Sequence, residues 1–235
     1  MINGKDRRNR STVRALVLAP LAIGGGFVVG MELGAVLEAP LAALDRALLM
    51  ALRTADEPAR PVGPEWLAIG VRDVTALGGH TLVIAIGLIV AGYLAVIGRW
   101  PRSLLIGATI AGAILLGALL KLGAARPRPE VVAHLVDVYS LSFPSSHALL
   151  AAVVYPTVGA LLAGTQTSRP VRVFVMTVAI ATTVLVGLTR LYLGVHWPTD
   201  VVAGWLIGGT WAAACWKLAQ WIGERRRGSG RPGAG

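Results

Sequence analysis

Charged residues are scarce in this 235-residue chain. Asp, Glu, Lys and Arg make up 14% of it, whereas apolar residues make up 55%, and an ordinary soluble domain carries roughly 25% charged residues. This deficit is typical of a protein that is solvated largely by lipid. Acidic residues are the scarcest, 12 against 22 Lys and Arg. The basic residues stand between apolar blocks rather than in a stripe with aromatic residues, which argues against a nucleic-acid partner.

Cysteine and metal-binding patterns are nearly absent as well. The single cysteine, Cys215, cannot form an internal disulfide. No group of Cys, His and carboxylate residues shows the spacing of metal ligands, and His80 and His134 stand apart from such residues. No glycine-rich phosphate loop of the Walker type occurs. The sequence therefore predicts neither a metal nor another cofactor, and nothing in it indicates an obligatory protein partner.

What the sequence does contain is a series of long apolar runs. A membrane-spanning helix needs about 20 mostly apolar residues, and six segments qualify: Ala15–Leu37, Gly79–Ile97, Leu104–Leu120, His147–Gly164, Val173–Leu188 and Asp200–Trp221. They predict an all-α fold, an integral membrane bundle of six transmembrane helices within one domain, residues 15–222. A basic segment, residues 1–14, precedes the bundle. A basic, glycine-rich tail, residues 223–235, follows it and is predicted to be disordered.

The placement of basic residues predicts the orientation. More of the 22 Lys and Arg residues fall on the side that holds both termini, and the positive-inside rule assigns that side to the cytoplasm. The first apolar run follows a basic segment but has no cleavage site of the signal-peptide type, so we interpret it as an uncleaved span. We therefore expect a multi-pass protein of the cell membrane, in contact with membrane lipids, with both termini cytoplasmic.

The segment Pro40–Arg53, between the first two spans, repeats leucine at helical spacing. Asp45, Arg46 and Arg53 lie off the leucine face. This pattern favours an amphipathic helix on the outer membrane surface, although a short soluble helix that covers the end of the bundle would also fit. The leucine face consists of Leu41, Leu44, Leu48 and Leu52.

Three polar clusters interrupt the second half of the chain, all on the predicted outer side. The first follows the third span and holds Lys121, Arg126 and Arg128. Basic side chains at a helix end often only reach lipid headgroups, and we assign Arg126 to that role. Three cations together are unusual there, because outer loops are generally poor in basic residues.

The second cluster is Pro144-Ser145-Ser146-His147, where the fourth span begins. The N-terminus of a helix presents free N–H groups that suit phosphate, although a serine at this place can equally be an ordinary cap. A histidine beside a basic loop can supply a proton, which makes His147 a candidate acid.

The third cluster holds Arg190, His196 and Asp200. His196 and Asp200 are four residues apart and share a face if a helix begins around Pro198. An aspartate that bonds one imidazole nitrogen leaves the other nitrogen free as a nucleophile or base. A solvated ion pair at the end of a span is the simpler alternative.

Together the clusters resemble the signature of the type 2 phosphatidic acid phosphatase superfamily, which includes lipid phosphate phosphatases and vanadium haloperoxidases. That signature reads K-x6-R-P, P-S-G-H and S-R-x5-H-x3-D, and the match here covers residues 121–200. Two positions depart from it, since Ser146 replaces the family's glycine and Thr189 replaces its serine. If the glycine is needed for a positive φ, Ser146 would be strained there.

The resemblance implies a set of roles. His196 would attack phosphorus and form a phosphohistidine, Asp200 would orient His196, and His147 would protonate the leaving oxygen and then activate water. The phosphate-binding residues would be Lys121, Arg128, Ser145, Ser146 and Arg190.

The function expected from the sequence is that of a metal-independent lipid phosphatase with an outward-facing site. Its substrate would be a lipid phosphomonoester or pyrophosphate: a polyprenyl pyrophosphate, phosphatidic acid or phosphatidylglycerol phosphate. A haloperoxidase is disfavoured because those relatives are soluble. A non-enzymatic lipid or small-molecule transporter with a phosphate-binding site is a second alternative. It is disfavoured because the charges cluster at span ends and no internal repeat is evident.

Overall fold

The computed structural model of the chain describes residues 39–229. The predicted first span, Ala15–Leu37, the segment 1–14 and residues 230–235 lie outside the described part. Two compact units are distinguished, Met1–Leu44 and Asp45–Gly235, and the second holds the bundle considered below. Residues 39–50 are helical. The later elements are α2 (Glu65–Thr75), the 3-10 turn η1 (Ala76–Gly78), α3 (His80–Val96), α4 (Trp100–Ala124), α5 (Ser146–Ala163), α6 (Arg169–Tyr192) and α7 (Pro198–Ser229).

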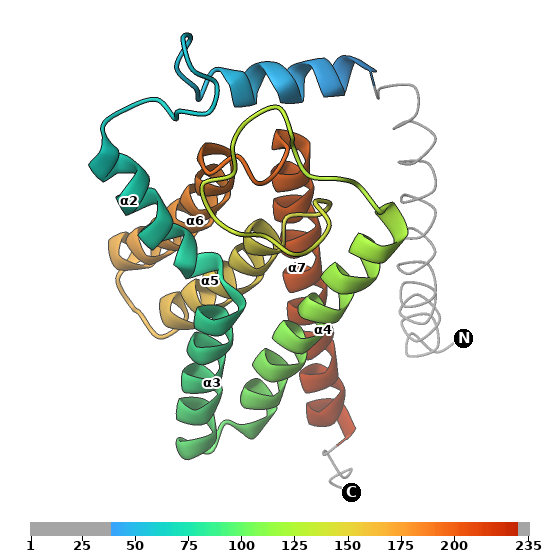
Figure 1. Cartoon of the computed structure of the whole chain (residues 1–235). Coiled ribbons are helices and arrows are strands. Elements are labelled where there is room, and N and C mark those ends of the chain that lie inside the picture. Colours follow the sequence, from blue (N-terminus) through green and yellow to red (C-terminus); the bar gives the residue numbers. More distant parts are fainter. Residues whose placement is uncertain (1–38, 230–235) are drawn as a thin grey trace, which may run out of the picture. The chain divides into compact units, whose positions relative to one another are not determined.

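The described residues are helical apart from loops and one isolated bridge between Arg53 and Pro61. This confirms the predicted all-α class. Four segments are long and apolar enough to cross a membrane: Trp100–Ala124, Ser146–Ala163, Arg169–Tyr192 and Pro198–Glu224. The stretch Glu65–Gly78 with α3 meets the same criterion as a pair bent by 47° (Figure 1). The described part thus holds four or five candidate spans.

The helices correspond to the predicted apolar runs, and α4, α6 and α7 extend beyond them. α4 and α6 each begin several residues earlier, with a proline in the first turn, where the missing N–H has no intrahelical partner to lose. α7 continues to Ser229, past the boundary predicted at residue 222, so residues 223–229 are helical rather than disordered. Arginine is a good helix former, so the run of arginines there can continue the helix. Hydropathy indicates only that the membrane span ends before them.

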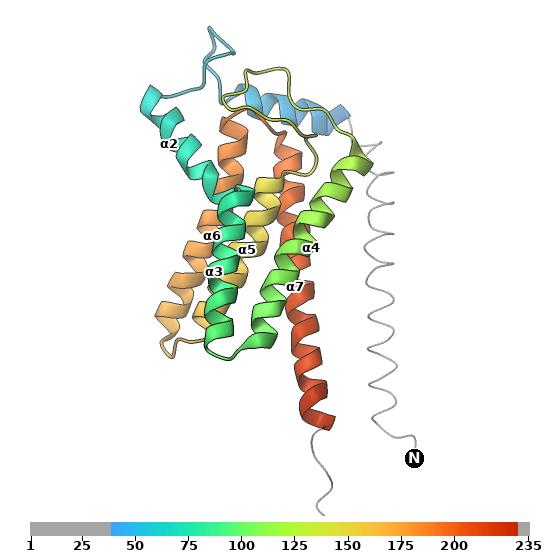
Figure 2. The same ribbon diagram turned by 60° about the horizontal axis from the view of Figure 1, so that its bottom comes forward.

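α5 is the central helix of the bundle and contacts α3, α4, α6 and α7. It is apolar on all sides, which is expected of a helix enclosed by others. In Figure 2 the other long helices run alongside it. Its core residues are Leu149, Leu150, Val153 and Val154, which pack with Val83, Ile106 and Ala113. The outer helices expose many large apolar side chains instead, among them Leu88, Ile89, Leu122 and Phe174.

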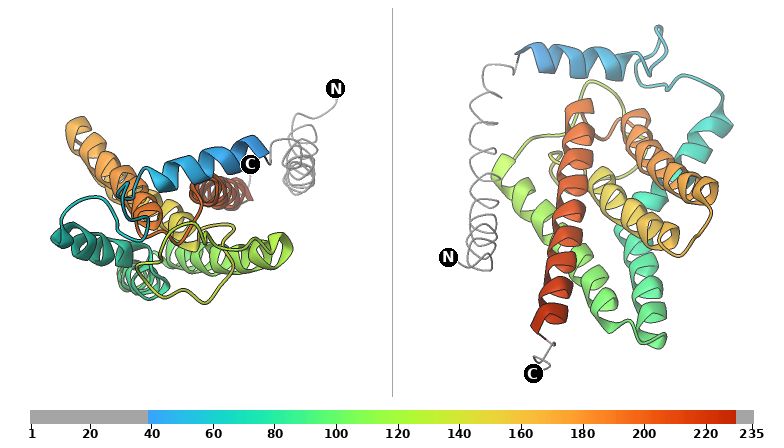
Figure 3. Two further views of the ribbon diagram at one scale, coloured as in Figure 1. Left: turned by 45° about the horizontal axis from the view of Figure 1, so that its top comes forward. Right: turned by 180° about the vertical axis from the view of Figure 1, so that it is seen from behind.

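All three polar clusters lie at one end of the bundle. The loop 125–145, the connection 193–197 and the start of α7 meet there, whereas the turns 97–99 and 164–168 lie at the opposite end (Figures 2 and 3). The loops are joined by backbone hydrogen bonds, such as that from Leu135 N–H to the Leu193 carbonyl at 3.0 Å. The fold therefore brings together residues that are widely separated in sequence.

Two glycines of α7 allow it to approach α5 closely. A Cβ at Gly204 would lie 2.8 Å from the Ser145 carbonyl oxygen, and one at Gly208 would overlap the Leu149 carbonyl oxygen. Small residues four apart commonly permit such contact between membrane helices. The approach is completed at the polar end, where Ser145 N–H donates to the Asp200 carbonyl at 3.1 Å.

Substitution of Gly208 by alanine is expected to destabilise the bundle, because the added methyl group meets backbone that cannot move without shifting α5. Overpacking of this kind costs about 1–3 kcal/mol. The measurement is thermal unfolding in detergent. Gly209→Ala is the matched control, since a Cβ at Gly209 has no atom within 4 Å, and equal behaviour of the two variants would contradict the close helix contact.

Candidate active site

His196 and Asp200 lie where α6 connects to α7. α7 begins at Pro198, so Asp200 is in its first turn and faces back toward His196. Both side chains are buried, with 2% and 0% of their surface exposed. Nδ1 of His196 is 3.7 Å from Oδ2 of Asp200. The structure therefore brings the two residues together as their spacing predicts, in a buried setting rather than as a solvated ion pair.

Ser142 completes this pair and was not predicted. Its hydroxyl donates to Oδ2 of Asp200, and its oxygen lies 3.4 Å from Nδ1 of His196. Because the hydroxyl proton points to the carboxylate, the serine oxygen is free to accept from Nδ1–H. The three side chains thus form a chain that engages Nδ1 of His196 and not Nε2. No pattern in the sequence singles out this serine, since it lies in a loop.

Arg128 reaches the other nitrogen of His196. Its NH1 group lies 3.3 Å from Nε2 and also donates to the Val195 carbonyl. Its Nε donates to the Ser140 carbonyl at 2.7 Å. These two carbonyl contacts hold the guanidinium beside the nitrogen that would act as nucleophile.

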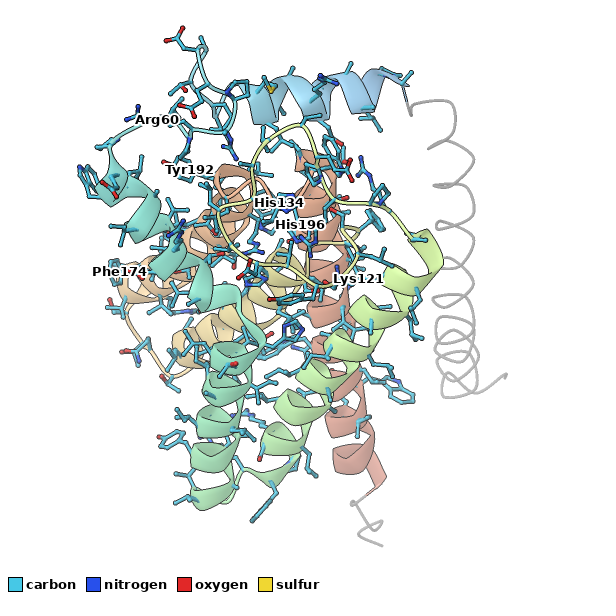
Figure 4. All side chains as sticks on the ribbon, in the orientation of Figure 1. Arg60, Lys121, His134, Phe174, Tyr192 and His196 are labelled. Carbon is cyan, nitrogen blue, oxygen red and sulfur yellow. The ribbon has the colours of Figure 1, made fainter. Side chains whose placement is uncertain are left out.

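Lys121 and Arg190 supply two further cations (Figure 4 labels Lys121 near His196). Lys121 Nζ donates to the carbonyls of Leu141 at 2.6 Å and Pro144 at 2.9 Å. Arg190 is buried and donates to Thr75 Oγ1 at 3.0 Å. Its Nε is a buried donor without an acceptor among the described residues. A buried donor left unsatisfied is costly, and a phosphate oxygen would satisfy it.

Ser145 acts as a helix cap. Its hydroxyl accepts from Ala148 N–H at 3.5 Å, and its own N–H is bonded to the Asp200 carbonyl. Its backbone N–H is therefore not free for phosphate, contrary to the sequence-based expectation. The N–H groups of Ser146 and His147 precede the first intrahelical bond of α5, from Leu149 to Ser145, and can serve an anion instead.

The two departures from the signature are accommodated without strain. Ser146 is the first helical residue of α5, and the one non-glycine residue with positive φ in the described part is Ala125. A glycine is therefore not required at position 146. The Thr189 hydroxyl donates to the Val186 carbonyl at 2.6 Å, so its hydrogen-bond partner lies within α6.

His147 lies close enough to Arg190, His196 and Arg128 for their charges to act on it. His80, which the sequence leaves isolated, is also within electrostatic range of His147 and Lys121. Its position at the start of α3 could not be related to the clusters by spacing, because the two regions meet only in the folded bundle.

Arg126, predicted to reach lipid headgroups, is hydrogen-bonded to groups of the protein. Its NH1 donates to Asp200 Oδ1 and Thr199 Oγ1, both at 2.7 Å, and its NH2 donates to Asp45 Oδ2 at 2.9 Å. Two buried carboxylates require a cation nearby, and Arg126 supplies it. Ala125, in the left-handed region at φ 46°, ends α4 and turns the chain at this point.

Asp45 is likewise held within the protein. It lies off the leucine face in the sequence pattern, and together with Leu49 it is fully buried, whereas Leu48 is 45% exposed. Arg53 is buried too and donates to the Tyr192 carbonyl at 3.0 Å. The face at Asp45 and Leu49 is therefore the one that contacts the protein, because Arg126 and Thr199 offer partners that outweigh the leucine pattern.

The family model described as PAP2 superfamily matches residues 102–224, which is more than half of the chain. The chain belongs to the PAP2 superfamily. This confirms the resemblance drawn from the three clusters.

Individual PAP2 relatives agree. Phosphatidylglycerophosphatase B of Bacillus subtilis is 33% identical over 146 residues, 61% of this chain and 70% of the relative. Decaprenylphosphoryl-5-phosphoribose phosphatase of Mycobacterium tuberculosis is 33% identical over 142 residues, 59% of this chain and 73% of the relative. The crystal structure of a transmembrane PAP2-type phosphatidylglycerolphosphate phosphatase from Bacillus subtilis superimposes with a TM-score of 0.71 at 29% identity. That match covers 83% of this chain and 94% of the other.

The matches establish this chain as a multi-pass membrane protein of the phosphatase class. Within the described residues, no group of three or more His, Cys, Asp or Glu side chains is placed to hold a metal ion. The polar groups of this PAP2 site are instead cations, imidazoles and a carboxylate.

Burial and charge keep His196 neutral. Its pKa is lowered to about 4, first by burial and then by the positive charges of Arg128 and Arg190, while Asp200 opposes the shift. A neutral imidazole with Nδ1–H directed to Ser142 and Asp200 carries its lone pair on Nε2. That is the form required of a nucleophile.

Removal of the cation beside Nε2 is expected to raise the pKa of His196. Arg128 disfavours the imidazolium, so in Arg128→Gln the ring should take up its proton at a higher pH than in the wild type. Nitrogen NMR of histidine-labelled protein in detergent measures this directly. The control is Arg60→Gln, which removes an exposed arginine. A pKa in Arg128→Gln that is unchanged or lower would contradict the electrostatic assignment.

Proposed function

We propose that this protein is a metal-independent membrane phosphatase that hydrolyses a lipid phosphomonoester or pyrophosphate through a phosphohistidine at His196. The observation that carries the proposal is the arrangement around this ring. Nδ1 is held by Ser142 and Asp200, and Nε2 faces the guanidinium of Arg128. An oriented, neutral nucleophile beside a cation is what attack on a phosphate ester requires.

In the first step Nε2 of His196 attacks phosphorus. The N–P bond forms while the P–O bond to the lipid breaks, and the leaving oxygen takes a proton from His147, which is protonated once the negative charge of the bound phosphate offsets that of the cations. Asp200 stabilises the positive charge that develops on the ring. Lys121, Arg128 and Arg190 surround the phosphoryl oxygens, whose charge they stabilise in the transition state.

In the second step water replaces the lipid. His147, now neutral, takes a proton from the water, whose oxygen attacks phosphorus while the N–P bond breaks. Inorganic phosphate leaves and His196 returns to its neutral form. Positioning and charge stabilisation account for most catalysis of phosphoryl transfer, so three cations can fulfil a role that other phosphatases give to a metal.

A lipid phosphate is supported as substrate by the surroundings of the site. Lys121 and Arg190 lie in the last turns of α4 and α6, and Arg128 lies in the loop after α4. Apolar helix surface meets polar loops there, so a headgroup can enter while its acyl or prenyl chain stays in the bilayer. The names of the relatives include phosphatidylglycerophosphatase and undecaprenyl-diphosphatase. We therefore propose phosphatidylglycerol phosphate, phosphatidic acid or a polyprenyl pyrophosphate.

We further propose six spans with both termini in the cytoplasm and the site on the outer or periplasmic side. The excess of Lys and Arg on the side of the termini supports this orientation. An interfacial position for residues 39–50 is supported by Leu48, a large apolar side chain that is 45% exposed.

Purified protein in detergent with excess EDTA is expected to release phosphate from one or more of these three lipid classes. His196→Ala should abolish release, because it removes the atom that attacks phosphorus. The measurement is inorganic phosphate, with a soluble aryl phosphate as a further substrate. Arg46→Gln, which alters an exposed residue outside the site, is the control for general effects of substitution.

Full activity in His196→Ala would disprove the nucleophile, and loss of activity with EDTA would disprove the metal-independent chemistry. Absence of release from every substrate by the wild type would contradict the proposed substrates. It would favour the alternative, a lipid transporter with a phosphate-binding site.

The orientation predicts that a cysteine at position 139 reacts with an impermeant thiol reagent added outside intact cells. Tyr139 is 96% exposed in the loop 125–145. The experiment uses Tyr139→Cys in a Cys215→Ser background. The matched control is Ser168→Cys, in the turn at the opposite end of the bundle, which should react only after lysis. The reverse labelling pattern would invert the topology.

A further inference from the structure

Two carboxylates at the polar end of the bundle share one arginine. Asp45 and Asp200 are both fully buried. Arg126 donates NH2 to Asp45 at 2.9 Å and NH1 to Asp200 at 2.7 Å. Ionised carboxylates are buried at great cost unless they are paired and hydrogen-bonded. The guanidinium, whose planar fork holds two oxygens in fixed directions, therefore determines where both carboxylates lie.

This contact fixes the rotation of the Asp200 carboxylate. Its Oδ1 is occupied by Arg126, and its Oδ2 accepts from the Ser142 hydroxyl and from Trp197 N–H at 3.0 Å. With Oδ1 held by Arg126, Oδ2 remains directed toward Nδ1 of His196. Without the arginine, one oxygen of a buried carboxylate would lack its donor and the group could turn.

Asp45 reinforces the arrangement from the other side. Its Oδ1 accepts from Thr199 N–H at 2.9 Å, and its Oδ2 accepts from the Thr199 hydroxyl at 2.6 Å. Thr199 is in the first turn of α7, directly before Asp200, where a negative charge is favoured by the helix dipole. Asp45 thus holds both Arg126 and the backbone that carries Asp200.

We propose that Arg126 and Asp45 are positioning residues for catalysis, which hold Asp200, and through it His196, in the orientation needed for attack on phosphorus. Neither residue is a signature position, since Arg126 lies between the fixed residues of the first block and Asp45 lies outside all three blocks. The inference rests on the proposed function, since it concerns the same nucleophile. It makes residues before the second span part of the catalytic arrangement.

The proposal predicts an effect on turnover rather than on substrate binding. In Arg126→Gln and in Asp45→Asn, kcat should fall by about 10–100-fold, the usual range for groups that orient a reacting side chain. KM should change little, because Lys121, Arg128 and Arg190 remain. Inhibition by inorganic phosphate, which measures the cation site without turnover, should also stay near the wild-type value. The control is Arg46→Gln, next to Asp45 in sequence but exposed.

A double variant tests whether Arg126 acts through Asp200. In the Asp200→Asn background, Arg126→Gln should cause little further loss of kcat. The carboxylate that Arg126 orients is already absent from that background. Independent roles would give multiplied losses. Arg126→Lys should recover part of the kcat lost in Arg126→Gln, since lysine restores the charge but not the fork.

Thermal unfolding in detergent, run on every variant, separates positioning from folding. If Arg126→Gln does not fold, the isosteric Asp45→Asn carries the test. The proposal is overturned if folded variants keep wild-type kcat, if KM rises instead of kcat falling, or if the losses multiply in the double variant. A wild-type protein without phosphate release would count against the proposed function itself, which the panel of lipids detects separately.

Discussion

The buried carboxylate of Asp200 is the charge on which the rest of the site depends. It accepts from the Ser142 hydroxyl, from Trp197 N–H and from Arg126, and its backbone carbonyl accepts from Ser145 N–H. A carboxylate without water must find such donors. To supply them, the loop 125–145, the start of α5 and the start of α7 must meet at one point. That convergence also places His147 and Lys121 around His196. The donors that the Asp200 carboxylate needs therefore determine where the other charged groups of the site lie.

The four Lys and Arg residues of the three clusters divide into two kinds. Arg126 is paired with carboxylates, so its charge is neutralised within the protein. Lys121, Arg128 and Arg190 are held chiefly by carbonyl and hydroxyl oxygens, which orient a cation without cancelling its charge. The site therefore retains a surplus of positive charge among buried groups, where charges interact more strongly than in water. Neutral acceptors thus preserve the charge that a phosphate group would meet.

The bundle and the three clusters could be predicted because their causes are local. The length of an apolar run reports what a helix needs to cross lipid, and the spacing of His196 and Asp200 holds within one helical start. Asp45, Ser142 and Arg126 could not be assigned in this way. Asp45 meets Thr199 across 154 positions of sequence, and the leucine repeat beside it reports only exposure to an apolar phase. The helical end of α7 was not predicted for a related reason. Hydropathy predicts which residues can lie in the bilayer, and a helix can continue beyond them.

The contacts of Asp45 and Thr75 bear on where the functional unit begins. The family model covers residues 102–224, yet Arg126 and Arg190 each have a partner outside that range, in Asp45 and Thr75 respectively. A fragment trimmed to the shared family segment would retain every signature residue but leave one guanidinium with a single carboxylate and the other without its hydroxyl. The recognisable module and the working module of this enzyme are therefore not the same length, and chimaeras between family members should exchange the earlier segments together with the signature blocks.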